Sequence, residues 1–210
     1  MSVPGGLGTA ASLLSWGSPQ QLHRVESGLD LWTTTVLDQD IASPGPDRLT
    51  VDDQVTALNL PEPRPDSASS GLPRTRTAVT VWEPQTLLGR WEARIRVLPG
   101  DDPDAVVGMD LAPATGPTVQ DPHPSLDSRT VTLTQESDVP TAGWHHWAVE
   151  RTASSTRFYL DGRLLTDTPS DPSEVGPVQL RWWIQSADET ARTPARAEAE
   201  WVAFYAGEGS

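Results

Sequence analysis

The stretch Arg90-Trp-Glu-Ala-Arg-Ile-Arg-Val-Leu98 decides the fold of this chain. Apolar and charged side chains alternate along it, so that one side carries Trp91, Ala93, Ile95 and Val97 while the other carries arginine and glutamate. A period of two is typical of a β-strand that turns one face to a core and the other to water. We therefore expect a strand here, in a sheet with one buried face.

Similar runs recur along most of the chain, separated by short segments that contain most of its 20 prolines and 16 glycines. A helical period is almost absent, and Asp161-Gly162, between two apolar runs, predicts a type I′ hairpin turn. Many short strands without helical spacers predict an all-β protein, an antiparallel β-sandwich. The runs expected as strands are Arg48–Leu60, Thr75–Trp82, Arg90–Leu98, Arg129–Gln135, Trp144–Arg151, Thr156–Leu160, Arg163–Thr166, Val178–Gln185 and Glu198–Tyr205.

The chain has 210 residues, which is enough for one sizeable domain with its own core. We expect a single domain over residues 16–206, an N-terminal arm over residues 1–15 and a tail over residues 207–210. The Pro- and Ser-rich stretch Pro61–Pro73 is interpreted as a long loop of this domain, because the strands on each side of it are too few for separate cores.

Composition excludes several classes of protein. There is no cysteine, which excludes disulfides, zinc–thiolate sites and cysteine nucleophiles, and no lysine, which excludes Schiff-base chemistry and a P-loop. A net charge of −14 disfavours nucleic acid and anionic membranes as partners. No stretch approaches the roughly 20 apolar residues of a membrane span, and no signal peptide is visible at the N-terminus.

Two long segments carry a specific pattern: Leu88-Gly-Arg-Trp-Glu-Ala-Arg-Ile-Arg96, and Trp144-His-His-Trp-Ala-Val-Glu150 followed by Thr156-Arg-Phe-Tyr-Leu-Asp-Gly-Arg163. They resemble the YGRFEARIR and WHTYAVEW…IRFYVDGR segments of glycoside hydrolase family 16, the laminarinase- and lichenase-like β-glucanases. Weaker matches in the same order are Leu29–Trp32, Leu49–Leu58 and Glu200–Tyr205. The resemblance implies a concanavalin A-like jelly roll over most of the chain.

The chain departs from this family where the catalytic acids belong. Retaining glycosidases need two carboxylates roughly 5–5.5 Å apart, and the family supplies them from one strand with the pattern E-x-D-x-x-E. Between Arg96 and Trp144 no glutamate pair has that spacing: Glu136-Ser-Asp138 offers the first half, but Thr141 stands in place of the third acid. We therefore predict a scaffold without its catalytic strand, with no catalytic residue, and interpret Glu136 and Asp138 as solvated loop acids.

The polar faces of two strands offer candidate carbohydrate-binding residues. The resemblance implies that Glu92 and Arg94 line a concave cleft and contact sugar hydroxyls; a cross-strand ion pair is the alternative. Trp183 alternates with Arg181 and Gln185, so its indole is expected on the solvent-facing side of its strand. Sugar rings stack on flat aromatic side chains, and arginine and glutamine bind hydroxyls. The alternative for Trp183 is a cover formed by the proline-rich loop.

The remaining tryptophans and histidines are interpreted mainly as structural. Trp91, Trp147 and Trp182 alternate with core positions, whereas Trp144 is ambiguous. His145 and His146 are adjacent on a strand and point to opposite faces, so they do not chelate one ion together; His145 is expected as a hydrogen-bonded core residue. His23 and His123 are expected in loops without partners.

No metal or cofactor is predicted. Asp101-Asp-Pro-Asp104 clusters oxygens of the kind calcium prefers, but no glycine-turned ligand loop follows it. We interpret this run as a solvated loop and keep calcium as the alternative.

Three functions follow as predictions. The first is a non-catalytic carbohydrate-binding or adhesion module, a pseudoenzyme that holds a β-glucan or galactan in its concave groove. The second is an active retaining endo-β-glycosidase with acids recruited from elsewhere, for example Asp110. The third is a structural component of a virion or surface particle with assembly partners. We expect an extracellular or particle-associated protein in each case.

Overall fold

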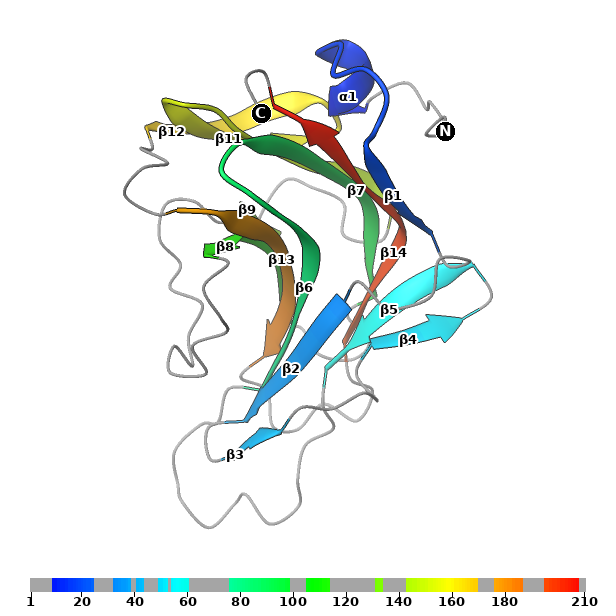
Figure 1. Ribbon diagram of the computed structural model, residues 1–210. Coiled ribbons are helices and arrows are strands. Elements are labelled where there is room, and N and C mark those ends of the chain that lie inside the picture. Colours follow the sequence, from blue (N-terminus) through cyan, green and yellow to red (C-terminus); the bar gives the residue numbers. More distant parts are fainter. Residues whose placement is uncertain are drawn as a thin grey trace.

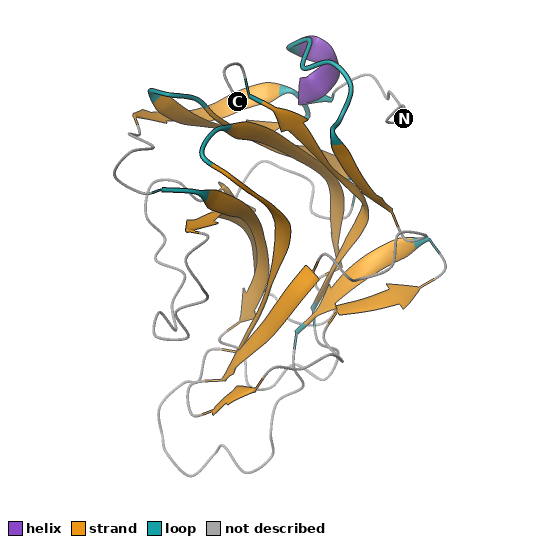
Figure 2. Ribbon diagram, in the orientation of Figure 1, coloured by secondary structure: helices purple, strands orange, loops and turns teal. Residues whose placement is uncertain are grey.

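The computed structural model describes residues 9–24, 32–38, 41–43, 49–52, 54–60, 76–98, 105–113, 131–133, 143–169, 176–186 and 195–207. Nearly all of this part of the chain is strand, and the strands form two antiparallel sheets packed face to face (Figures 1 and 2). The fold is an antiparallel β-sandwich of the jelly-roll kind, as the alternation of apolar and polar residues predicts.

The first sheet, called sheet A, has eight strands. Its order is β12-β11-β10-β7-β14-β5-β4, and β1 also pairs with β14, beyond the end of β5. The strands are β1 (Gln21–Arg24), β4 (Leu49–Asp52), β5 (Val55–Asn59), β7 (Gly89–Leu98), β10 (His145–Arg151), β11 (Ser155–Leu160), β12 (Arg163–Pro169) and β14 (Arg196–Ala206).

The second sheet, sheet B, has six strands in the order β3-β2-β6-β13-β8-β9. They are β2 (Trp32–Asp38), β3 (Ile41–Ser43), β6 (Arg76–Thr86), β8 (Val106–Pro113), β9 (Val131–Leu133) and β13 (Val178–Ser186). Strands β6 and β13 curve, and the hollow side of the curve faces away from β7 and β14 (Figure 1). Sheet B therefore has a core face and a concave outer face.

The core lies between the two sheets and is rich in tryptophan. Trp91 and Trp147 enter it from sheet A, and Trp82 and Trp182 enter it from sheet B; each is at most 1% exposed. The prediction that Trp91, Trp147 and Trp182 are packing residues is confirmed. The residues that alternate with these core residues along the same strands face outward. The alternation therefore decides which side chains are available for function.

Each expected strand run contains a strand, and the predicted hairpin turn is present. Asp161 and Gly162 have φ angles of 49° and 75°, the two positive values that a type I′ turn needs. Four strands were not expected from the alternation: β1, β2, β3 and β8. Pro61–Pro73 lies outside the described residues.

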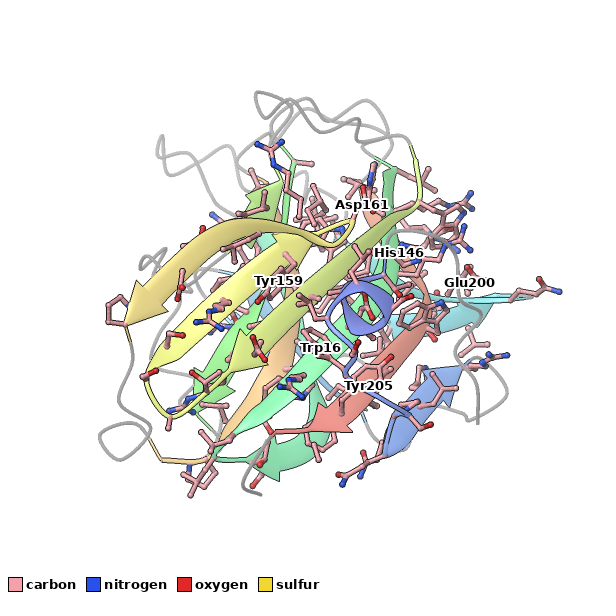
Figure 3. All side chains as sticks on the ribbon, turned by 90° about the horizontal axis from the view of Figure 1, so that it is seen from above. Trp16, His146, Tyr159, Asp161, Glu200 and Tyr205 are labelled. Carbon is pink, nitrogen blue, oxygen red and sulfur yellow. The ribbon has the colours of Figure 1, made fainter. Side chains whose placement is uncertain are left out.

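One short helix, α1 (Ala10–Leu13), precedes β1 and lies on the outer face of sheet A (Figures 1 and 3). Within residues 9–15, expected as part of an arm, Ala10 and Ala11 pack on the sandwich, while residues 12–15 are exposed. In the described residues, no helix is long and apolar enough to span a bilayer.

Candidate functional site

The concave face of sheet B brings three of the predicted site residues together. Arg181, Trp183 and Gln185 are alternate residues of β13, while the residue before each of them belongs to the core: Leu180, Trp182 and Ile184. Across the sheet, β8 places Asp110 opposite Arg181 and Gly108 opposite Trp183. This set forms a row on the outer side of the sheet, as the alternation predicts.

Trp183 lies on the predicted face of its strand but is not solvent-facing. Its indole is 1% exposed and rests on Gly108, where an added Cβ would come within 2.1 Å of Cζ2 of the indole. Its Nε1 has no hydrogen-bond partner among the described residues. The expectation of an exposed indole is therefore wrong: the ring lies against Gly108 of β8 and is buried in the folded chain.

Arg181 and Asp110 form a bidentate ion pair on this face. Arg181 donates from Nε and Nη2 to the two carboxylate oxygens of Asp110, both at 2.6 Å. The Asp110 side chain is 3% exposed, whereas that of Arg181 is 23% exposed. Asp110, the acid suggested as a relocated catalyst, is therefore buried and held by the guanidinium of Arg181. A bidentate pair of this kind fixes the orientation of the carboxylate and balances its negative charge.

Glu92 and Arg94 lie on β7 of sheet A, on the outer face opposite to the concave face of sheet B. The five predicted binding residues are thus split between two outer faces of the sandwich and cannot form one groove. The resemblance placed Glu92 and Arg94 at the concave cleft; the structure places them on the other sheet, beneath and beside the N-terminal segment.

Glu92 is fully buried under α1. Its Oε1 accepts a hydrogen bond of 2.6 Å from the backbone N–H of Ala10, and its Oε2 accepts one of 3.3 Å from that of Ala11. Burial raises the pKa of Glu92 to about 7, although the two N–H groups act in the opposite direction. Neither oxygen is directed to solvent, so in this conformation Glu92 serves the helix.

Arg94 takes part in an ion-pair strip between β7 and β14. It pairs with Glu200, and Arg96 pairs with Glu198. The guanidinium carbons lie 5.2 Å (Arg94) and 4.7 Å (Arg96) from the ring centre of Trp144, in the range of cation–π contacts. The cross-strand ion pair, kept as the alternative for Arg94, is present.

The histidines have structural partners. His145 Nδ1 lies 2.8 Å from Oδ2 of Asp161, so His145 is hydrogen-bonded as expected, but its side chain is 14% exposed and lies outside the described core. The ring of His146 lies 5.7 Å from that of Trp201. His23 was expected in a loop without partners, which is wrong: it lies in β1, is 1% exposed and contacts Thr56 Oγ1 at 3.1 Å. Burial lowers the pKa of His23 to about 4.

Several predictions fall on residues that the structure does not describe. They concern Glu136, Asp138, Thr141, His123 and the run Asp101–Asp104. Between β8 and β10 the structure describes one strand, β9, whose residues Val131, Thr132 and Leu133 carry no carboxylate. Among the described side chains, no group of three or more histidine, aspartate or glutamate residues could hold a metal ion.

Sequence reasoning missed the site on the outer face of sheet A where α1 packs. On each side of Glu92 its neighbour across the sheet is an alanine, Ala148 on β10 and Ala203 on β14. Around this spot lie Trp16, Tyr159 and Tyr205, which pack with both alanines in one cluster (Figure 3). The signal in the sequence was the pair of alanines on outward positions of strands, where a polar residue is usual.

Comparison with solved structures places this sandwich among known folds. LamAcat from Zobellia galactanivorans superimposes with a TM-score of 0.63 at 14% identity, over 92% of this chain and 99% of that one. A laminarinase from Flavobacterium sp. UMI-01 gives 0.63 at 12% identity, over 90% and 100%. The chain has the laminarinase fold. A lichenase from a mouse hindgut metagenome agrees, with 0.58 at 14% identity over 88% and 98%.

The resemblance to family 16 β-glucanases that the sequence suggests therefore holds for the fold. No protein-family model matches the sequence, and a search of curated proteins finds no match either. At these low identities the laminarinase fold says how the strands are arranged and leaves the chemistry to the residues of this chain.

Proposed function

We propose that this protein is a non-catalytic carbohydrate-binding module on a β-glucanase-like sandwich. The polysaccharide, of the β-glucan or galactan type, lies on the concave face of sheet B. The observation that carries this proposal is the Asp110–Arg181 ion pair on the outer side of β8 and β13. It places a polar guanidinium on this face, and it engages both oxygens of the acid there in hydrogen bonds.

The solved relatives supply the class of ligand. A variant of the Z. galactanivorans protein LamA, which has a TM-score of 0.63 and 14% identity, is in complex with laminaritriose and laminaritetraose. The alignment covers 90% of this chain and 99% of that one, which supports a linear glucan as the kind of ligand to place on the curved sheet. Laminari-oligosaccharides are therefore the first ligands to test.

Each residue on this face has a distinct proposed role. Arg181, partly exposed and held in place by Asp110, donates to sugar hydroxyls, and Gln185 adds an amide donor and acceptor. Trp183 supports them from below as a rigid base on Gly108. Glu92 and Arg94 are not part of this proposed site, because α1 and Glu200 occupy them.

The second predicted function, an active endo-β-glycosidase, is less well supported. It needs two carboxylates roughly 5–5.5 Å apart, one of them free to attack or to donate a proton. Among the described side chains of sheet B, Asp110 is the one acid, and both of its oxygens accept hydrogen bonds from Arg181. No observation favours the third function, a virion or particle component, and the extracellular setting stays a prediction.

Calorimetric titration with laminaritetraose, and a reducing-sugar assay on laminarin and lichenan, test the proposal together. We expect saturable binding and no release of reducing sugar. The variant Gln185→Ala should weaken binding by about tenfold, the equivalent of one or two hydrogen bonds. The double variant Asp110→Asn/Arg181→Gln should weaken it at least as much, without leaving a buried charge unpaired.

The matched control is Gln21→Ala, an exposed glutamine on β1 of sheet A, which should bind like the wild type. Absence of binding to glucans and galactans, or binding that both concave-face variants leave unchanged, would contradict the proposed site. Release of reducing sugar would contradict the non-catalytic assignment.

A further inference from the structure

The outer face of sheet A holds a cradle for a short helical segment. Its floor is Glu92 with Ala148 and Ala203 on either side, all at most 1% exposed. Alanine side chains rise little above a sheet, so the backbone of α1 approaches closely enough to contact the carboxylate between them. Small residues around one acid make a shaped recess for a helical turn.

The polar anchor of this cradle is Glu92. It accepts from the N–H groups of Ala10 and Ala11, which lie at the start of α1 and have no partner within the helix. The N-cap Thr9 accepts a third bond, 3.1 Å from the N–H of Ser12. The first turn of the segment is thus satisfied jointly by its own cap and by a side chain of the sheet.

The aromatic anchor is Trp16, which is 7% exposed. Its ring meets Tyr159 edge-on at 6.1 Å and Tyr205 at 5.6 Å between ring centres. The guanidinium carbon of Arg90 lies 5.7 Å from the centre of the indole. Figure 3 shows α1 and Trp16 over the sheet with Tyr159 and Tyr205 beside them. A buried tryptophan between two tyrosines is the composition of an interface anchor.

The segment between these anchors is a discrete unit. A hydrogen bond from Trp16 N–H to the carbonyl of Ala11 closes the end of α1, with Ser15 at a φ of 56°. Gly17 follows at a φ of 81°, and backbone hydrogen bonding of this end to β14 begins at Gln20, whose N–H donates to the carbonyl of Phe204. Residues 9–16 therefore hold the sheet by side-chain and capping contacts alone, and are joined to it through a glycine.

We infer that the cradle is a peptide-binding site and that residues 9–16 of a second copy of this chain occupy it in exchange for the chain's own segment. Exchange preserves every contact described above, since the segment and the cradle are the same in both arrangements. What favours the intramolecular arrangement is the effective concentration that the short connection provides, on the order of millimolar. Leu13 and Leu14, 61% and 43% exposed on the segment, give the exchanged form further apolar surface to cover.

Two complementary full-length variants test this inference. Trp16→Ala has a weakened segment and an open cradle, and Ala203→Leu has an intact segment and a filled cradle. Neither variant combines an intact segment with an open cradle. In a mixture, the intact segment of Ala203→Leu can bind the open cradle of Trp16→Ala. We expect each variant alone to sediment as a monomer and the equimolar mixture, at about 0.1 mM, to form a heterodimer. Association in the mixture should be at least tenfold tighter than in either variant alone.

The double variant Trp16→Ala/Ala203→Leu is the matched control, because it offers neither segment nor cradle. Its mixture with Trp16→Ala should remain monomeric. Folded variants whose mixture stays monomeric would overturn the inference, and so would a dimer that also forms with the double variant. Circular dichroism establishes folding beforehand; if Ala203→Leu does not fold, Ala148→Leu fills the cradle from the other side of Glu92.

Discussion

Gly108 is the residue that allows Trp183 to lie on the concave face. Its strand passes directly beneath the indole, and an added Cβ would come within 2.1 Å of Cζ2 and 2.2 Å of Cε2. Ring atoms cannot rotate away from such a contact, so either the tryptophan or β8 must shift. We expect Gly108→Ala to destabilise the protein by about 1–3 kcal/mol, the usual cost of overpacking, measured by urea denaturation.

Gly143→Ala is the matched control for this prediction. There the nearest atom to the added Cβ is Nε2 of His145 at 3.5 Å, an ordinary contact. If Gly108→Ala were as stable as the control, the packing of Trp183 on β8 described above would be wrong.

Glu92 predicts a pH dependence of stability. Its pKa is raised from 4.5 to about 7 by burial, so the folded state holds a proton that the unfolded state has already released. The stabilisation is therefore complete below about pH 4.5 and is lost as the pH rises to about 7. Relative to Glu92→Gln, the wild type should lose about 3 kcal/mol of unfolding free energy over this interval.

Urea denaturation at pH 5 and pH 8 of both proteins measures this difference. The subtraction is necessary because burial of His23, with a pKa lowered to about 4, acts in the opposite direction and weakens the fold as the pH falls. Parallel curves for the two proteins would contradict the prediction. The titratable or charged groups around Glu92 are Arg90 and Arg94 on β7, His146 and Glu150 on β10, Tyr159 on β11 and Tyr205 on β14.

At the scale of elements, the end of α1 offers a stabilising substitution. Ser15 has a φ of 56°, in the left-handed region where a side chain costs roughly 1 kcal/mol and glycine does not. We expect Ser15→Gly to raise the unfolding free energy by about 1 kcal/mol and to slow hydrogen exchange in α1. Thermal unfolding and amide exchange measure the two effects.

Ser18→Gly separates this effect from a general influence of glycine. Ser18 is exposed and its φ is not positive, so glycine there only adds freedom to the unfolded chain. That variant should be slightly less stable than the wild type. Equal shifts in both variants would show that the backbone of Ser15 is not strained.

Strand elements could be predicted where apolar and polar residues alternate in the sequence. In β7 apolar and charged residues alternate in the sequence, which revealed the strand even though α1 also buries Glu92. Strand β8 was not predicted. Its consecutive residues Val107, Gly108, Met109 and Asp110 are all buried, and its sequence lacks a regular alternation of apolar and polar residues. The pattern that reveals a strand lies in the residue types and not in burial, since β10 and β14 are covered on both faces and were still predicted.

At the scale of the whole molecule, the candidate site was predicted only in part. Alternation correctly placed Trp183 away from the core and Glu92 on the polar side of its strand. The partners of outward-facing residues come from distant parts of the chain. Glu92 accepts a hydrogen bond from α1, 82 residues away in sequence, and Arg181 pairs with Asp110, 71 residues away. Burial of an outward face depends on such distant partners, and no local pattern contains them.

The position of β14 has a consequence for biosynthesis. It is the last strand of the described chain, yet it lies inside sheet A, with β7 on one side and β5 and β1 on the other. Until residues 196–206 have left the ribosome, β7 and β5 present unpaired edges and β1 has no neighbour in the sheet. The nascent chain must therefore protect these edges from foreign strands during synthesis, and sheet A is completed late, when β14 inserts between β7 on one side and β5 and β1 on the other.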